Sequence, residues 1–251
     1  MSTYQNNNIK LVVKNIEKNF ESMNIIKNVS FYANENEFVS LLGPSGSGKS
    51  TIFNIISGLM IQDAGRIIID GEECSSRLKK VSYMRQKDLL LPWKNIIDNV
   101  TLPLVIKGKA KREARKQVLE YFKVFGLVGF EYKYPFQLSG GMRQRAALLR
   151  TYMASSDIML LDEPFGALDA ITRSKMHSWL LDVIKELKAT IIFITHDIEE
   201  AVFLSDRIYV LSDKPATIKA EIIVDLPKTR TKDIVTSEKF NEIKKEILLA
   251  L

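Results

Sequence analysis

The sequence predicts an α/β fold in which helices cover both faces of a mainly parallel sheet. Short apolar segments alternate along the chain with segments whose apolar residues recur at helical spacing, a pattern typical of strand–helix–strand units. Residues 43–51, GPSGSGKST, join one such strand to one such helix and match the phosphate-binding P-loop pattern G-x-x-x-x-G-K-[ST]. In sheets of this kind ligands lie at the carboxyl ends of the strands, so we expect a binding site there.

Length and composition limit the class of protein. The chain has 251 residues, 46% of them hydrophobic, which suffices for one large domain or a domain with an inserted or appended subdomain. No apolar run approaches the roughly 20 residues of a membrane helix, and residues 1–8 lack a signal-peptide apolar region, so we expect a soluble intracellular protein. Cys74 is the only cysteine, which excludes an intrachain disulfide. The net charge of +6 comes from lysines scattered among glutamates and indicates a solvated surface, not a particular partner.

The first half of the chain predicts strands around the P-loop. Apolar runs indicate strands at residues 9–15, 38–42, 66–71 and 81–85. Helical spacing after the P-loop predicts a helix that ends near Ser57. We expect Phe20 in a polar loop and Gln86 at the end of its strand, and residues 88–93 as an exposed apolar loop.

The second half predicts helices followed by further strands. Apolar residues at helical spacing indicate a mainly helical subdomain that ends near Phe136, and Ser139 is a natural N-cap for a helix through Tyr152. The expected elements are helices at about 96–106 and 110–125, strand 158–161, helix 170–187, strands 190–195, 207–211 and 218–224, and a terminal helix at about 237–251. The terminal helix has Phe240, Ile243, Ile247 and Leu251 on one stripe, which indicates core packing.

The P-loop predicts how the chain holds a nucleotide. Its glycines let the backbone curl so that N–H groups point inward, and the helix N-terminus adds unpaired donors and a positive dipole. Lys49 would reach the β- and γ-phosphates, and the Ser50 hydroxyl would bind Mg²⁺. An ordinary glycine-rich turn is the alternative, and it would not need the lysine, the hydroxyl and both flanking elements. The residues expected to bind ATP are Gly43, Pro44, Ser45, Gly46, Ser47, Gly48, Lys49, Ser50 and Thr51.

Two carboxylates follow a short apolar strand. Asp162 ends the strand and is expected to bind Mg²⁺ together with Ser50. Glu163 comes next, points a different way, and is placed to orient or deprotonate the attacking water. An isolated pair of this kind would more often be a solvated strand end, but its place downstream of a complete P-loop favours the functional interpretation.

Two more polar residues come at strand ends. His196 directly follows strand 190–195, where it would hydrogen-bond the γ-phosphate. Gln86 would contact Mg²⁺ or the attacking water, although an isolated strand-end glutamine is more often inert. His177, the other histidine, is expected at an exposed helical position and receives no role.

A second anion-binding device begins at Leu138. Ser139, Gly140 and Gly141 place a hydroxyl and bare backbone N–H groups at the start of a helix. Spacing alone leaves open that this is a plain capped helix.

Together these motifs resemble those of the ATP-binding cassette (ABC) ATPases over nearly the whole chain. The matching segments are the P-loop, Gln86 as the Q-loop glutamine, residues 138–142 as the signature, 160–164 as Walker B, 167–169 as the D-loop and 195–197 with the switch histidine. The resemblance implies a single P-loop NTPase cassette with an antiparallel-β and a helical subdomain. Residues 1–86 and 157–225 would form the ATPase core with its antiparallel-β part, 87–156 the helical subdomain and 226–251 a C-terminal helical extension.

The resemblance also implies how the site works. Two cassettes would meet head-to-tail as a homodimer, so that Ser139, Gly140 and Gly141 of one copy close on ATP held by the other. Lys49, Gln86, Glu163 and His196 would be the catalytic residues, and Ser50, Gln86 and Asp162 would surround Mg²⁺. In this family a tyrosine upstream of the P-loop stacks on adenine. Phe20 is the candidate here, and Tyr32 is the alternative.

A narrower resemblance is to the nitrate/sulfonate/taurine-type (NitT/TauT) importer ATPases. It rests on residues 86–93, QKDLLLPW, on YPFQLS at 134–139 and on DEPFGALD at 162–169. It implies the energy-coupling subunit of an importer for a small, anionic or nitrogen- or sulfur-containing solute, on the cytoplasmic face of the membrane. A permease would dock at residues 89–93, for which an ordinary subdomain junction is the alternative, and an extracytoplasmic solute-binding protein would act through the permease.

The competing class is a soluble ABC ATPase that acts on nucleic acid or ribosomes. The basic charge favours it, but the chain has no long coiled-coil insertion and no aromatic-basic nucleic-acid motif. We therefore expect no nucleic-acid partner. The transported solute stays open among nitrate, sulfonates, bicarbonate, and pyrimidine or thiamine precursors.

Overall fold

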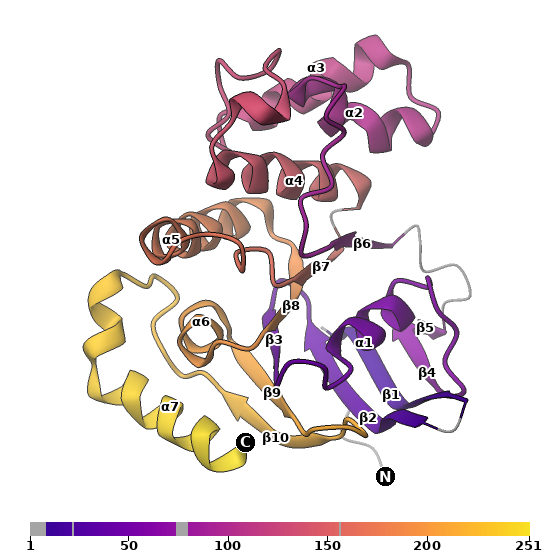
Figure 1. Cartoon of the computed structure of the whole chain (residues 1–251), viewed down its shortest axis with the longest axis vertical. Coiled ribbons are helices and arrows are strands. Elements are labelled where there is room, and N and C mark those ends of the chain that lie inside the picture. The colour runs from indigo at the N-terminus through magenta and orange to yellow at the C-terminus, as the bar shows by residue number, and fades with distance from the viewer. Residues whose placement is uncertain (1–8, 22, 74–79, 156) are drawn as a thin grey trace.

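The computed structural model describes residues 9–21, 23–73, 80–155 and 157–251, and Figure 1 shows how their elements are arranged. Cys74 lies outside these residues. The strands are β1 (Ile9–Phe20), β2 (Met23–Asn34), β3 (Phe38–Leu42), β4 (Ala64–Ile69), β5 (Glu72–Glu73), β6 (Val81–Met84), β7 (Ile158–Asp162), β8 (Thr190–Thr195), β9 (Arg207–Leu211) and β10 (Ile218–Ile223). The helices are α1 (Lys49–Ile56), α2 (Ile96–Ile106), α3 (Lys111–Phe122), η2 (Pro135–Gln137), α4 (Gly140–Ala154), α5 (Ala170–Leu187), α6 (Ile198–Leu204), η3 (Lys232–Thr236) and α7 (Glu238–Ala250).

The central sheet has the strand order β10-β9-β3-β8-β7-β6. All its neighbouring strands are parallel except the edge pair β10–β9. Every residue of β3, β7, β8 and β9 is buried, because helices or the second sheet cover both faces. The α/β fold with a mainly parallel sheet is confirmed.

Successive residues of a strand pack into two different cores. In β3, Val39 and Leu41 belong to a core with α1 and the antiparallel sheet. Phe38 and Leu42 of the same strand belong to a core with α4, α5, α6 and α7. This alternation follows from the two-residue period of a strand, which places neighbouring side chains on opposite faces.

A second, antiparallel sheet has the order β2-β1-β4-β5 and lies beside α1 (Figure 1). The strand expected at residues 9–15 in fact continues to Phe20, so the placement of Phe20 in a loop was wrong. Strand β2 was likewise not predicted from the sequence. Asn15 and Asn28 both have positive φ, 51° and 52°, and the β1–β2 register shifts between Val13 and Ile16. The polar, asparagine-containing segment is therefore an irregular hairpin and not a loop.

Helices α2, α3 and α4 lie together at one end of the molecule (Figure 1). Buried Asn99 fixes the loop before α2: its amide nitrogen donates to the carbonyls of Leu91, Lys94 and Asn95 at 3.1, 2.9 and 3.0 Å. In the apolar loop, Leu89 and Trp93 are exposed as expected, but Leu90 is buried in the core.

The C-terminal segment packs α7 against α6 and β10. Phe240, Ile243 and Ile247 are buried as expected from the stripe, whereas Leu251 is exposed, because it lies beyond the end of α7. Among the described residues, no helix has both the length and the hydropathy needed to cross a bilayer.

Candidate nucleotide site

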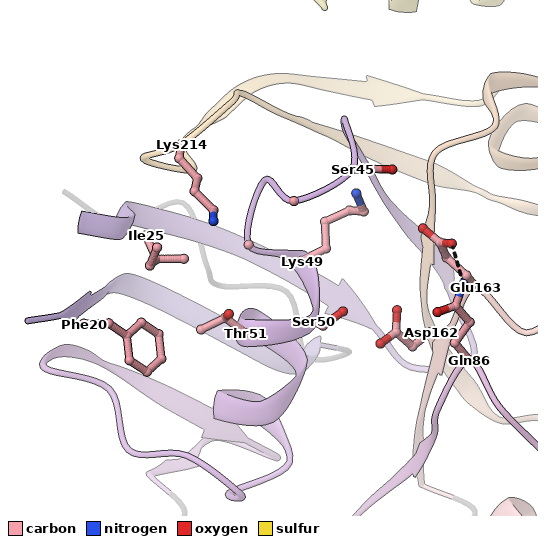
Figure 2. Close-up of a pocket in the computed structure, with 12 residues that line it drawn as sticks. Phe20, Ile25, Ser45, Lys49, Ser50, Thr51, Gln86, Asp162, Glu163 and Lys214 are labelled. Atoms are coloured by element: carbon pink, nitrogen blue, oxygen red, sulfur yellow. Dashed lines mark hydrogen bonds between the residues drawn. The ribbon is translucent and has the colours of Figure 1, made fainter. Parts of the chain in front are cut away.

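The P-loop lies between β3 and α1 and forms the wall of a 540 Å³ pocket. Gly48 precedes α1 with φ of 109°, a left-handed conformation that favours glycine. The pocket is lined by Phe20, Ile25, Ser45, Gly46, Gly48, Lys49, Ser50, Thr51, Gln86, Asp162, Glu163 and Lys214. Figure 2 shows the acidic and amide side chains at one end of it, and Phe20, Ile25 and Lys214 at the other.

Lys49 folds back over the loop that precedes it. Its Nζ donates to the carbonyl oxygens of Gly43 at 2.8 Å and Pro44 at 2.7 Å. Burial lowers the pKa of the Lys49 ammonium, and the nearby Glu163 and Asp162 oppose this shift. The Lys49 cation is thus desolvated and held by neutral carbonyls, an arrangement suited to an anionic ligand.

Ser47, in the same loop, does not line the pocket. It is buried, and its hydroxyl oxygen has no hydrogen-bond partner among the described residues. The Lys49 ammonium and the backbone at the start of α1 do line the pocket, and both suit the oxygens of a phosphate. The P-loop residues therefore fit a nucleotide phosphate.

Asp162 ends β7 and is buried beside the P-loop helix. The hydroxyl of Tyr83 donates to its Oδ2 at 2.9 Å. Burial raises the pKa of Asp162, while hydrogen bonds from Tyr83 and Ser50 and the charge of Lys49 act in the opposite direction. A hydroxyl and a carboxylate oxygen are ligands that Mg²⁺ prefers, so Ser50 and Asp162 fit this ion.

Two of the predicted residues, Gln86 and His196, contact the carboxylate of Glu163. Its Oε1 is 3.0 Å from His196 Nδ1, and its Oε2 accepts a hydrogen bond from Gln86 Nε2 at 3.3 Å (Figure 2 shows the latter). Glu163 has φ of 43°, and its backbone N–H donates to the carbonyl of Ile194. The structure thus brings together side chains that follow β6, β7 and β8, as their expected places at strand ends implied.

The far end of the pocket contains residues that sequence reasoning missed. Ile25 lies on β2, which was not predicted, and Lys214 lies in the loop between β9 and β10. Phe20 lines this end too. Tyr32 instead packs against Arg207, whose guanidinium carbon is 4.4 Å from the centre of the tyrosine ring. Ile25 could have been placed at the site only if residues 23–34 had been recognised as a strand.

Tyr83 is a further missed residue. It lies on β6, and its register partner is Leu160 on β7, two residues before Asp162. Its ring also meets Phe53 of α1 edge-on, with centroids 5.6 Å apart. The Tyr83 hydroxyl reaches the Asp162 carboxylate only because β6 pairs with β7. The residues around Tyr83 in the sequence therefore do not indicate this contact.

The signature residues lie outside this pocket. Ser139 caps α4, and its Oγ accepts a hydrogen bond from the backbone N–H of Met142 at 3.3 Å. A Cβ at Gly140 would lie 3.1 Å from Leu168, and one at Gly141 would lie 3.4 Å from Thr172. These glycines therefore allow α4 to pack closely on the start of α5, and they do not line the P-loop pocket of the same chain.

The expectation for His177 was wrong. Its side chain is only 12% exposed, and its Nε2 lies 2.7 Å from Glu200 Oε1 on α6. The helical pattern of α5 did not indicate this contact, because the partner comes from a helix 23 residues further along the chain.

Comparisons with known proteins decide the family. The family model described as "ABC transporter" matches residues 26–166, more than half of the chain. This chain belongs to the ABC transporter family. The resemblance found in the motifs is confirmed, and as a member of this family the chain binds ATP and is an ATPase.

Curated relatives match this ABC chain over most of their length. It is 44% identical to the formylaminopyrimidine import ATP-binding protein ThiZ of Halalkalibacterium halodurans, over 89% of this chain and 88% of the relative. It is 42% identical to the aliphatic sulfonates import ATP-binding protein SsuB of Bacillus cereus, over 94% and 92%. It is 39% identical to the nitrate import ATP-binding protein NrtD of Synechocystis, over 88% and 86%.

Solved structures support the same family. The dimeric structure of MJ0796, a bacterial ABC transporter cassette, has a TM-score of 0.74 and 34% identity and covers 86% of this chain and 100% of that one. A post-hydrolysis state of the MJ0796 cassette, bound to ADP and Pi, has a TM-score of 0.72 and 33% identity at the same coverage.

Proposed function

We propose that this chain is the energy-coupling subunit of an importer for a small solute and that it hydrolyses MgATP in the P-loop pocket. One observation carries the residue assignments: Gln86 and His196 both contact the Glu163 carboxylate beside Lys49 and Asp162. A carboxylate held from two sides and placed next to a phosphate-binding loop has the geometry needed for a general base.

Binding of the triphosphate involves the P-loop, Gly43 to Thr51. Lys49 exchanges its carbonyl partners for the β- and γ-phosphates. Ser50 and Asp162 would hold Mg²⁺, and Gln86 lies at the same end of the pocket (Figure 2). When bound, Mg²⁺ neutralises charge on the phosphate oxygens. Phe20 stacks on the adenine at the other end.

Activation of water involves Glu163. Its two oxygens are oriented by His196 and Gln86, so the carboxylate keeps one position while it accepts a proton from the attacking water. In the proposed reaction His196 also hydrogen-bonds the γ-phosphate and so links the base to the reacting group. Electrostatic positioning of this kind supplies most of the acceleration in phosphoryl transfer.

A second copy of the chain completes the site. Ser139, Gly140 and Gly141 begin α4, outside the pocket of their own chain, with backbone N–H groups that suit an anion. In a head-to-tail homodimer they bind the γ-phosphate held by the partner subunit. ATP then stabilises the closed dimer and hydrolysis reopens it, because ATP makes more contacts in the closed state.

The names of the relatives support a role in import and narrow the solute class. They describe import of formylaminopyrimidine, aliphatic sulfonates and nitrate. The proposed solute is small and anionic or contains nitrogen or sulfur. In this proposal the chain lies on the cytoplasmic face of the membrane and binds a transmembrane permease, and a solute-binding protein acts through the permease. Exposed Leu89 and Trp93 suit the permease contact.

Transport in reconstituted vesicles tests this function. The chain is purified with the permease encoded beside it, inserted into liposomes with ATP, and supplied with the binding protein and labelled nitrate, an alkyl sulfonate or a formylaminopyrimidine. We expect ATP-dependent uptake of one of these, and none with Glu163→Gln. If the chain instead binds RNA or ribosomes with strong salt dependence and associates with no permease, the soluble ABC ATPase replaces the importer.

A further inference from the structure

We propose that His177 is a positioning residue for hydrolysis, which holds Glu200 and, through Thr195, the turn that presents His196 to Glu163. This role goes beyond the proposed function and rests on it, because it requires that His196 and Glu163 act in the reaction. It concerns α5 and α6, which contribute no residue to the nucleotide pocket.

The connection is a chain of hydrogen bonds through one carboxylate. His177, on α5, has its Nε2 2.7 Å from Glu200 Oε1. The other oxygen of Glu200, Oε2, accepts a short hydrogen bond from the Thr195 hydroxyl at the end of β8. Glu200 on α6 therefore joins α5 to the last residue before His196.

The turn around His196 is closed by the same groups. Thr195 Oγ1 accepts a hydrogen bond from the backbone N–H of Asp197 at 3.0 Å, and Asp197 Oδ1 accepts one from the N–H of Glu200 at 3.1 Å. His196 lies between Thr195 and Asp197 in this hydrogen-bonded turn, and its side chain is 54% exposed. Since neighbouring side chains do not enclose the imidazole, its direction toward Glu163 depends on the turn that carries it.

Burial makes the Glu200 carboxylate dependent on His177 for a hydrogen bond. The side chains of His177 and Glu200 are only 12% and 8% exposed. The rings of Phe165 and Phe203 lie 5.4 and 6.3 Å from the imidazole, centre to centre. A carboxylate oxygen this buried needs a donor, and without the imidazole it would be left unpaired.

An adjacent cavity offers Glu200 another orientation. This 220 Å³ pocket is lined by His177 and Glu200 together with charged residues from three elements, namely Arg173, Asp197, Glu199 and Lys232. Arg173 Nε is buried without a partner among the described residues. If the imidazole is removed, Glu200 can turn into this pocket toward Arg173 or Lys232 and release Thr195.

Two substitutions separate positioning from simple packing. His177→Leu removes the hydrogen bond and fills the space, whereas His177→Gln keeps an N–H donor for Glu200. Lys175→Ala, on the exposed side of α5, is the matched control. We expect His177→Leu to lower kcat for ATP at least about 10-fold with the ATP Kd within about twofold, since one lost hydrogen bond of ~1.4 kcal/mol corresponds to tenfold. His177→Gln should recover to within about threefold.

The sequence provides a direct structural readout, because it contains only two histidines. In both position-177 variants of the untagged chain the one remaining imidazole is that of His196, so the Hε1 NMR signal belongs to this residue. We expect that signal to differ from wild type in His177→Leu and to return in His177→Gln. Equal His196 signals in the two variants, or wild-type kcat in His177→Leu, would overturn the proposal. The proposal would also be overturned if His177→Leu and His177→Gln lost the same share of kcat and showed the same decrease in melting temperature.

Glu163→Gln separates this inference from the proposed function. If that variant is inactive while His177→Leu matches wild type, the site assignment stands and the role of His177 is wrong. If Glu163→Gln hydrolyses ATP at the wild-type rate, the site assignment itself fails, and with it the basis for the role of His177.

Discussion

Glu163 and His196 are 33 residues apart in the chain, yet Nδ1 of the histidine lies 3.0 Å from Oε1 of the glutamate. The contact exists because β7 and β8 are adjacent parallel strands, so that the residues after them meet at one edge of the sheet. Gln86 holds the other oxygen of the same carboxylate. The arrangement leads to predictions for the base, for nucleotide binding, for the metal site and for assembly.

Replacement of the base should separate binding from turnover. Glu163→Gln keeps the size of the side chain and removes its basicity. We expect kcat to fall at least ~100-fold, the size of a lost general base, while ATP still binds. Single-turnover hydrolysis and calorimetric ATP affinity are the measurements. Near-wild-type hydrolysis by this variant would remove Glu163 from its role.

Lys49→Ala should abolish tight nucleotide binding. The ammonium is desolvated in the free chain and is held by the carbonyls of Gly43 and Pro44, so it is available for phosphates. Calorimetry of the variant with ATP should give no measurable high-affinity phase. An unchanged affinity would refute the P-loop assignment.

Tyr83→Phe should weaken the metal site. The variant lacks a hydrogen bond to Asp162 that contributes about 1.5–3 kcal/mol, so we expect the Mg²⁺ requirement for ATPase activity to rise at least about tenfold. Burial already raises the pKa of Asp162, and loss of this donor raises it further. Protons compete with Mg²⁺ for the carboxylate, so activity falls as the pH decreases, and the midpoint of that fall should move to higher pH in the variant.

Magnesium titrations at pH 6 and pH 8 test this prediction. The defect of Tyr83→Phe should be larger at pH 6. Tyr121→Phe is a suitable control, because Tyr121 packs against Tyr152 in the helical part of the chain. Identical magnesium curves for wild type and Tyr83→Phe at both pH values would show that this hydroxyl does not support the metal.

Phe20→Ala should raise the Kd for ATP about tenfold or more, because stacking of one base on an aromatic ring contributes about 1–3 kcal/mol. Tyr32→Phe should leave the Kd unchanged, since Tyr32 packs against Arg207 and does not line the pocket. Fluorescent nucleotide titrations distinguish the two residues. The opposite pattern would make Tyr32 the adenine contact.

The central sheet and most of the site could be predicted from the sequence. Strands β3, β7 and β8 are buried on both faces, so each is a mostly apolar run that is easily recognised. The candidate site residues Asp162, Glu163 and His196 lie at or directly after the ends of these runs. For that reason, the meeting of Asp162, Glu163 and His196 at one edge could be expected from the order of elements alone.

Contacts that depend on distant partners could not be predicted. Strand β2 contains polar residues and a positive-φ asparagine, so its identity depends on pairing with β1. Tyr83 reaches Asp162 only through the β6–β7 register. His177 has an ordinary helical context, and Glu200 gives it a role only after α5 and α6 pack together.

Ser139 lies outside the P-loop pocket of its own chain, so its substitution should impair assembly without changing ATP binding. Ser139→Asp keeps an N-cap of equal quality for α4, so the fold should be preserved. Its negative charge would face the triphosphate bound by the partner subunit, where like charges repel. We therefore expect the variant to bind ATP with wild-type affinity but to lose ATP-dependent dimerisation and hydrolysis.

Light scattering in the Glu163→Gln background measures this effect, because that variant should retain ATP and accumulate as a dimer. Ser139→Asn, which caps the helix without a charge, is the matched control and should dimerise better than Ser139→Asp. If Glu163→Gln alone remains monomeric at saturating MgATP, even beside its permease, the head-to-tail dimer is wrong. If Ser139→Asp dimerises as well as Ser139→Asn, the signature helix does not face the nucleotide of the partner subunit.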